Sequence, residues 1–125
     1  MRDKNVIRKW RRSEGSVVRR GIALGKFNLR RIVLDVVKPA VEPSLVSIAE
    51  AIAGVRGVES VNLTVEEVDS KTEGLLVTIE GEEMDFSKLS EAISGCGAVV
   101  HSVDQVAGGE RMIESVPVPL SRVRR

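Results

Sequence analysis

The chain of 125 residues predicts one α+β domain, in which two helices cover one face of a four-stranded antiparallel sheet. Two observations lead to this fold class. Segments with the two-residue period of strands and the 3.6-residue period of helices follow in the order β-α-β-β-α-β. The sequence also repeats itself, since "IAEAIAG" (48–54) matches "LSEAISG" (89–95) and "VESV" (58–61) matches "VHSV" (100–103). Two right-handed βαβ units close into such a sandwich.

The first half-unit begins with "LRRIVLDVV" (29–37), whose β-branched residues predict a strand. "EPSLVSIAEAIAGV" (42–55) carries apolar residues along one helical face, and Pro43 suits the first turn of that helix. "VESVNLTVEEV" (58–68) alternates between apolar and polar residues, which predicts a second strand. The side chains of this strand expected to face the helices are Val61, Leu63 and Val65.

The second half-unit follows a polar turn at 69–74. "LLVTIEG" (75–81) alternates as a third strand, and Asp85 is placed to cap a helix at 86–95. "VVHSVDQV" (99–106) supplies the fourth strand. These elements predict the ferredoxin-like sandwich with strand order 4-1-3-2. "RMIESV" (111–116), which ends at Pro117, predicts a fifth strand returning along the fourth.

Charge divides the chain into three parts. Residues 1–28 hold nine basic and two acidic residues and are expected to form a disordered basic arm. Residues 29–116, the ferredoxin-like domain, hold seven basic and 16 acidic residues. Residues 117–125 add three arginines as a basic tail, so a net charge of +1 conceals an acidic body between basic ends.

Composition narrows the function classes. With one Trp, two Phe and no Tyr, the core is expected to be aliphatic, and the sheet lacks the aromatic faces that stack nucleic-acid bases. The single cysteine, Cys96, allows neither an internal disulfide nor a zinc-chelating pair. We find no membrane span, no secretion signal and no haem, flavin or nucleotide signature, and we therefore expect a soluble, cytoplasmic protein.

Strand alternation assigns the polar residues to faces. By the repeat, His101 and Val103 are expected to face the helices, with His101 as a buried, hydrogen-bonded structural residue. Ser102 and Asp104 then lie on the opposite side, which we call the open face. His101 and Asp104 therefore share no ligand unless a β-bulge intervenes.

The open face is also expected to carry carboxylates on adjacent strands. Asp35 points outward between the strands that hold Glu80 and Asp104. Oxygen ligands of this kind suit Ca²⁺ or Mg²⁺. The sequence therefore predicts a divalent-cation site at Asp35, Glu80 and Asp104. The alternative is an acidic face that is solvated or packed against another subunit.

Apolar residues on the same face predict self-association, through this face or through the strand at 111–116. The residues concerned are Val33, Val37, Leu76, Val100 and Val106.

Four stretches resemble the archaeal family catalogued as domain of unknown function 211: "RRIVLDVVKP", "GVESVNLTVEEVD", "LLVTIEGEEMDF" and "VVHSVDQVAGGE". The resemblance covers about residues 28–116, and the basic stretch 1–28 departs from that family's compact start. It implies a ferredoxin-like fold and ring-shaped homo-oligomers, and it brings no established activity. The chain is also distantly similar to heavy-metal-associated domains, but "KPAVEPS" (38–44) lacks their Cys-x-x-Cys.

These observations favour a non-enzymatic, oligomeric binding or scaffold module. One alternative is nucleic-acid binding through the basic ends, which the acidic body disfavours. Another is regulatory binding of a small molecule at a subunit interface, with the loops at 38–44 and 81–86 as candidate sites. Catalysis is disfavoured, because a buried His101 and an isolated Cys96 offer no activated nucleophile.

Overall fold

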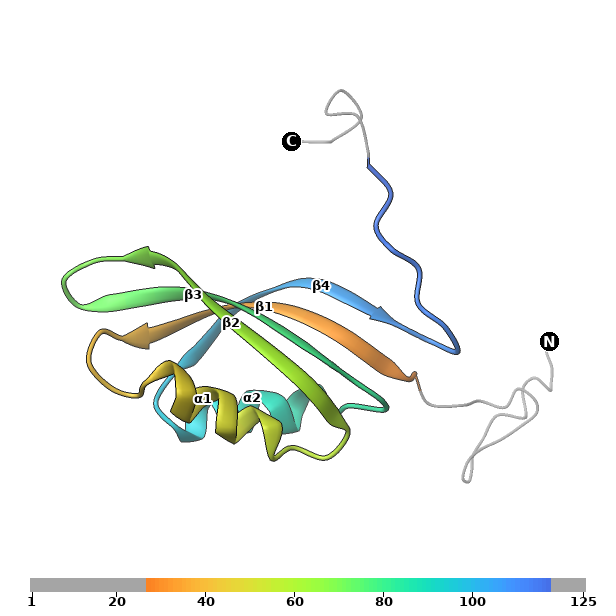
Figure 1. Ribbon diagram of the computed structural model, residues 1–125, viewed down its shortest axis with the longest axis horizontal. Coiled ribbons are helices and arrows are strands. Elements are labelled where there is room, and N and C mark those ends of the chain that lie inside the picture. The colour runs from red at the N-terminus through yellow and green to blue at the C-terminus, as the bar shows by residue number, and fades with distance from the viewer. Residues whose placement is uncertain (1–26, 118–125) are drawn as a thin grey trace.

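The computed structural model describes residues 27–117, and six elements lie within them in the predicted order (Figure 1). They are β1 (Leu29–Pro39), α1 (Leu45–Ala53), β2 (Val58–Val68), β3 (Thr72–Gly81), α2 (Phe86–Gly95) and β4 (Val99–Gly108). Of the predicted basic arm at 1–28 only the last two residues are described, and of the tail at 117–125 only the first. The rest of both segments lies outside the described residues. Neither helix of the described part is long and apolar enough to cross a membrane.

The four strands form one antiparallel sheet in the order β2-β3-β1-β4. This is the predicted 4-1-3-2 order read from the other edge, and the α+β, ferredoxin-like prediction is confirmed. Both helices lie against one side of the sheet, and no helix formed by residues 27–117 lies on the other side (Figure 1). The central strands β1 and β3 pair without a break from Arg31↔Glu80 to Pro39↔Thr72. That pairing sets which side chains share the open face.

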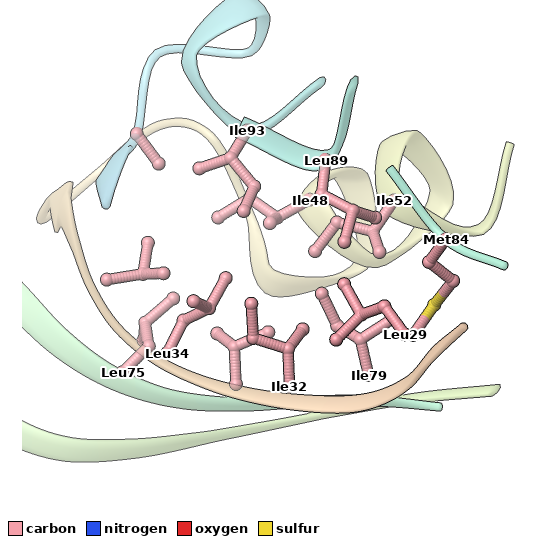
Figure 2. Packing of buried hydrophobic residues seen from close by; sticks show 13 residues of the cluster. Leu29, Ile32, Leu34, Ile48, Ile52, Leu75, Ile79, Met84, Leu89 and Ile93 are labelled. Atoms are coloured by element: carbon pink, nitrogen blue, oxygen red, sulfur yellow. The ribbon is translucent and has the colours of Figure 1, made fainter. Parts of the chain in front are cut away.

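The core between the sheet and the helices is aliphatic, as predicted (Figure 2). Full burial of one Leu or Ile side chain contributes about 1.5–3 kcal/mol, so this cluster is the main stabilising element of the domain. Its fully buried members are Leu34, Val36, Ile48, Ile52, Leu75, Val77, Ile79, Leu89 and Ile93.

Both helices begin at a capping side chain. The carboxylate of Asp85 accepts a hydrogen bond from the backbone N–H of Ser87 at 2.9 Å, so the predicted cap is confirmed. Its hydrogen bonds with the Ser87 hydroxyl and backbone lower the pKa of Asp85. The hydroxyl of Ser44 caps α1 by accepting from Ser47 N at 3.1 Å. Pro43 therefore precedes the cap, and its predicted place in the first turn is wrong.

The hairpin between β2 and β3 is shorter than predicted. Oδ1 of Asp69 accepts hydrogen bonds from the backbone N–H groups of Lys71 and Thr72, both at 2.8 Å, and these bonds lower the pKa of Asp69. The carboxylate completes a tight turn by this local bonding. As a result β3 already starts at Thr72.

The core side of the sheet ends at a buried lysine. Lys38 is 2% exposed, and its ammonium donates to the carbonyl oxygens of Pro39 (2.7 Å) and Ala40 (3.2 Å) and to Oε1 of Glu73 (3.2 Å). All three ammonium donors thus have an acceptor, which makes a buried charge tolerable.

Candidate functional site

The open face is assembled from alternate residues of the strands, and the pairing register decides its membership. Paired residues of an antiparallel sheet point to the same side. Asp35 is paired with Leu76 of β3 and with Ser102 of β4, while its neighbours Leu34 and Val36 are buried under the helices. The predicted outward orientation of Asp35 and Ser102 is therefore confirmed.

Two β-bulges in β4 place His101 on this face. The pairing with β1 shifts by one residue between Asp35 and Val36 and again between Val33 and Leu34, so His101 and Asp104 have no partner of their own. An extra residue in one strand breaks the two-residue alternation. Nδ1 of His101 lies 3.4 Å from Oδ2 of Asp35, and the histidine side chain is 67% exposed. The prediction of a buried, helix-facing His101 is wrong.

The bulges also change the neighbours of His101. Val100, Val103 and Val106 pair with the buried residues of β1, so these three lie on the helix side, where Val103 was predicted. The predicted places of Val100 and Val106 on the open face are wrong. Val99, paired with Val37, takes the open face in their stead.

Ser102 does not act together with His101. Its hydroxyl donates to Oδ1 of Asp104 at 2.8 Å, and the imidazole contacts Asp35. Asp104 is thereby on the open face, as predicted. The serine, histidine and aspartates form two separate pairs and not the relay that activates a serine nucleophile.

The predicted cation ligands lie on the open face but at different positions along the strands. Glu80 is paired with Arg31, four residues along β1 from Asp35. At about 3.3 Å per residue this corresponds to roughly 13 Å. Glu80 is bound to Arg31 at 2.7 Å instead. Among residues 27–117 no three His, Cys, Asp or Glu side chains are placed to hold one metal ion, so the structure does not bring Asp35, Glu80 and Asp104 together.

Arg31 is the charged centre of the opposite end of the face. Its guanidinium donates from Nε to Glu80 and from Nη1 to Glu114, at 2.7 and 2.9 Å. Hydrogen bonds with Glu114 and Glu80 raise the pKa of Arg31, and the same arginine lowers the pKa of Glu114. Glu114 lies beyond β4, so this arginine ties the segment after β4 to the sheet.

That segment is not the predicted fifth strand. Residues 111–117 form neither a strand nor a helix, and we call residues 110–117 the C-terminal arm. The side chain of Arg30 donates to the carbonyl oxygens of Gly109 (2.7 Å) and Glu110 (2.8 Å). In a fifth strand, such carbonyl groups would accept hydrogen bonds from the backbone of a neighbouring strand. Side chains of β1 thus take the place of a backbone ladder, and the arm rises on the side of the sheet opposite the helices (Figure 1).

Apolar side chains gather at the far end of the open face. Val37 lies between Val99 of β4 and Gly74 of β3, and Leu76 is diagonal to it. Val99 is 61% exposed. We call Val37, Leu76 and Val99 the apolar end. Val37 and Leu76 are half-buried within the sheet, and Val99 on the edge strand is the most exposed of the three.

A groove of about 1570 Å³ lies on the helix side, where α1 ends and α2 begins. Met84 and Leu29, both nearly buried, belong to its lining, along with the more exposed Phe27 and Phe86. The predicted loop 81–86 contributes Glu82 to Phe86, whereas no residue of the loop 38–44 lines the groove. Sequence reasoning missed Phe27. One sequence signal could have indicated it. Phe27 and Phe86 are the only aromatic residues of the described part, and they lie just before β1 and at the start of α2.

Comparison with known proteins adds the family. The model of DUF211, described as "Uncharacterized ArCR", matches residues 30–122. The chain belongs to the DUF211 family. An uncharacterized protein of the archaeon Methanocaldococcus jannaschii, MJ0319, is 42% identical over 94 residues, which are 75% of this chain and 96% of that protein. The predicted resemblance is thus confirmed. The DUF211 match includes the sheet from the second residue of β1 onward and the C-terminal arm.

Proposed function

We propose that this DUF211 protein is a non-enzymatic binding module that assembles with copies of itself through the open face. The observation that carries the proposal is the apolar end, where Val37, Leu76 and Val99 lie together on the face without helices. Contiguous apolar patches on a protein surface mark sites of interaction with other proteins.

The size of the face supports the proposal. Four strands spaced at about 4.8 Å, each about ten residues long at about 3.3 Å per residue, span on the order of 600 Å² in projection. Stable protein interfaces bury roughly 800 Å² per partner. The open face together with the C-terminal arm is therefore large enough for a stable contact.

The edges of the sheet are less suitable for assembly. A ring, as the family resemblance implies, can be built by pairing β2 of one copy with β4 of the next, since the two outer strands run in opposite directions. Each carries two extra residues that interrupt its pairing. Bulges on edge strands hinder such edge-to-edge pairing. The open face is therefore the better supported surface.

The polar groups of the face support binding rather than catalysis. Its histidine contacts Asp35, and its serine is occupied by Asp104, so no activated nucleophile is assembled there. A cation shared by Asp35, Glu80 and Asp104 forms no part of the proposal, because Arg31 holds Glu80 at the other end of the face.

Light scattering after gel filtration tests the proposal. We expect a mass of at least two chains for the wild type and dissociation by Val99→Asp, which places a charge on the apolar end. Val46→Asp is the matched control, because Val46 is 66% exposed on α1, at the other side of the domain. A monomeric wild type, or equal masses for both variants and the wild type, would refute the proposal.

A second candidate function is binding of an amphipathic small molecule in the groove. Phe27, Met84 and Phe86 offer apolar contacts there, and Arg56, Lys88, Glu83 and Glu91 add both signs of charge. Sites that combine an apolar lining with a few charged groups suit metabolites with an apolar body and charged ends. A thermal-shift screen with apolar and polar amino acids tests it. Stabilisation that is lost in Phe86→Ser but kept in Val46→Asp supports the candidate, and no shift with any compound contradicts it.

A further inference from the structure

The groove at the end of α1 and the start of α2 exposes both aromatic residues of the described part. Phe27 and Phe86 are 60% and 39% exposed, and they lie beside the nearly buried Met84 in its lining. Aromatic side chains bury a large apolar area when a partner covers them. The groove therefore offers an apolar contact surface on the helix side of the domain.

The wall of the groove formed by residues 82–84 is held in place by the domain itself. Its three successive backbone N–H groups all have acceptors, so the groove is formed without an occupant. The acceptors for Glu82, Glu83 and Met84 are the carbonyl oxygen of Gly57 (2.9 Å), Oδ1 of Asn28 (2.6 Å) and the carbonyl oxygen of Leu29 (3.2 Å).

The charged side chains around the groove are predominantly acidic. Within residues 27–117, no ion pair involves Glu83 or Glu91, and both are exposed. An occupant that combines positive charges with apolar side chains complements such a lining. The four carboxylates and two cationic groups of the lining belong to Glu82, Glu83, Asp85 and Glu91 and to Arg56 and Lys88.

The chain carries a segment of this composition directly before the groove. Residues 1–26, which we call the N-terminal segment, lead into Phe27 and hold nine basic and two acidic residues. Its stretch "VIRKWRR" (6–12) combines three apolar residues with four basic ones. Trp10 in this stretch is the only aromatic residue of the chain besides Phe27 and Phe86. One short stretch thus supplies both kinds of group that the groove calls for.

Length and volume both permit docking within one chain. Trp10 precedes Phe27 by 17 residues. A connection of this length spans at most about 60 Å. Short tethers give effective concentrations on the order of mM, so even a weak contact is populated. The groove of about 1570 Å³ exceeds the roughly 300–1,000 Å³ of small-molecule sites, and a chain segment fills it more completely.

We propose that the N-terminal segment docks in the groove of its own chain, with Trp10 against Phe27 and Phe86. The basic residues around Trp10 then lie beside the carboxylates of Glu83 and Glu91. This inference does not depend on assembly through the open face. It gives the groove an occupant from the chain itself, which a metabolite has to displace in order to bind there.

Fluorescence of the full chain tests the proposal, because Trp10 is its single tryptophan. We expect emission at a shorter wavelength than that of the free peptide 1–26. Glu83→Lys combined with Glu91→Lys is expected to abolish this shift. The matched control, Glu42→Lys combined with Glu66→Lys, makes the same charge change at exposed residues outside the groove lining and is expected to retain it. Circular dichroism confirms that both variants are folded.

Salt and dilution complete the test. Raising the salt from about 0.1 M to about 1 M shortens the Debye length from about 10 Å to about 3 Å, so the shift is expected to decrease. Emission equal to that of the peptide, or a shift that the groove variant retains, overturns the proposal. A shift that disappears on dilution also overturns it, because the segment then docks on another copy. Val99→Asp is expected to keep the shift, which separates this proposal from assembly through the open face.

Discussion

Nδ1 of His101 lies 3.4 Å from Oδ2 of Asp35, on the face of the sheet that the helices leave open. The two side chains are 67% and 42% exposed, so water screens their interaction. The contact indicates that β4 has a β-bulge at His101, because a regular strand would turn this side chain toward the helices.

Asp35→Asn is expected to shift the imidazole resonances of His101, whereas Glu80→Gln is expected to leave them unchanged. A double-mutant cycle over Asp35 and His101 should give less than about 1 kcal/mol of coupling, as for other exposed pairs. NMR of the single histidine provides the measurement. Unchanged imidazole resonances in Asp35→Asn would argue for the helix-facing histidine that the repeat predicts.

Asp85→Ala is expected to lower the melting temperature by about 5 °C, because the backbone N–H of Ser87 loses its acceptor. Asp85→Asn retains a capping oxygen and serves as the control. Since the folded state lowers the pKa of Asp85, the advantage of the wild type over Asp85→Asn is complete above about pH 4. That advantage is expected to disappear as the pH falls through the lowered pKa. A difference that grows on acidification would contradict this role.

Glu73→Ala is expected to destabilise the domain more than Lys38→Met does. The first change leaves a buried ammonium without its carboxylate, at a cost of about 2 kcal/mol. The second fills the same space with an apolar chain and leaves Glu73, which is 23% exposed, in contact with water. Urea denaturation of both variants gives the order, and the reverse order would show that the carbonyl groups of Pro39 and Ala40 alone compensate the charge.

Gly81→Ala is expected to cost about 2 kcal/mol or more, because a Cβ there would overlap the carbonyl oxygen of Gly57. Gly95→Ala is the matched control. A Cβ at Gly95 meets no atom within 4 Å, and Gly95 ends α2, so this change should alter stability by less than about 1 kcal/mol. Chemical denaturation measures both, and equal effects would contradict the close approach of the two glycines.

The central strands could be placed from the sequence because each has a partner on both sides. From Arg31 onward β1 keeps its alternation along the paired length of β3, so Asp35 and Glu80 were assigned to the correct face. The assignment of a face says nothing about position along the strand. Register set Glu80 beside Arg31, and for that reason the predicted cation ligands do not meet.

The edge strand could not be placed in the same way. β4 is held on one side only, so extra residues at His101 and Asp104 are accommodated without disturbing β1. Nothing in "VVHSVDQV" distinguishes a bulged strand from a regular one, since its match to "VESV" is equally good for both. The segment 111–116 has strand-forming residues, but bonding to Arg30, Arg31 and Gln105 keeps it from joining the ladder.

The two extra residues in β4 also bear on how this domain can change over generations. Insertions and deletions are usually tolerated in loops. Here the two extra residues lie inside a strand, at the two β-bulges where the backbone already departs from regular pairing. Loss of one such residue would straighten the strand locally and rotate the side chains between the two points, while the aliphatic interior kept its contacts. The other edge strand, β2, also carries two extra residues, so each half of the molecule can acquire a new surface chemistry by a single codon deletion.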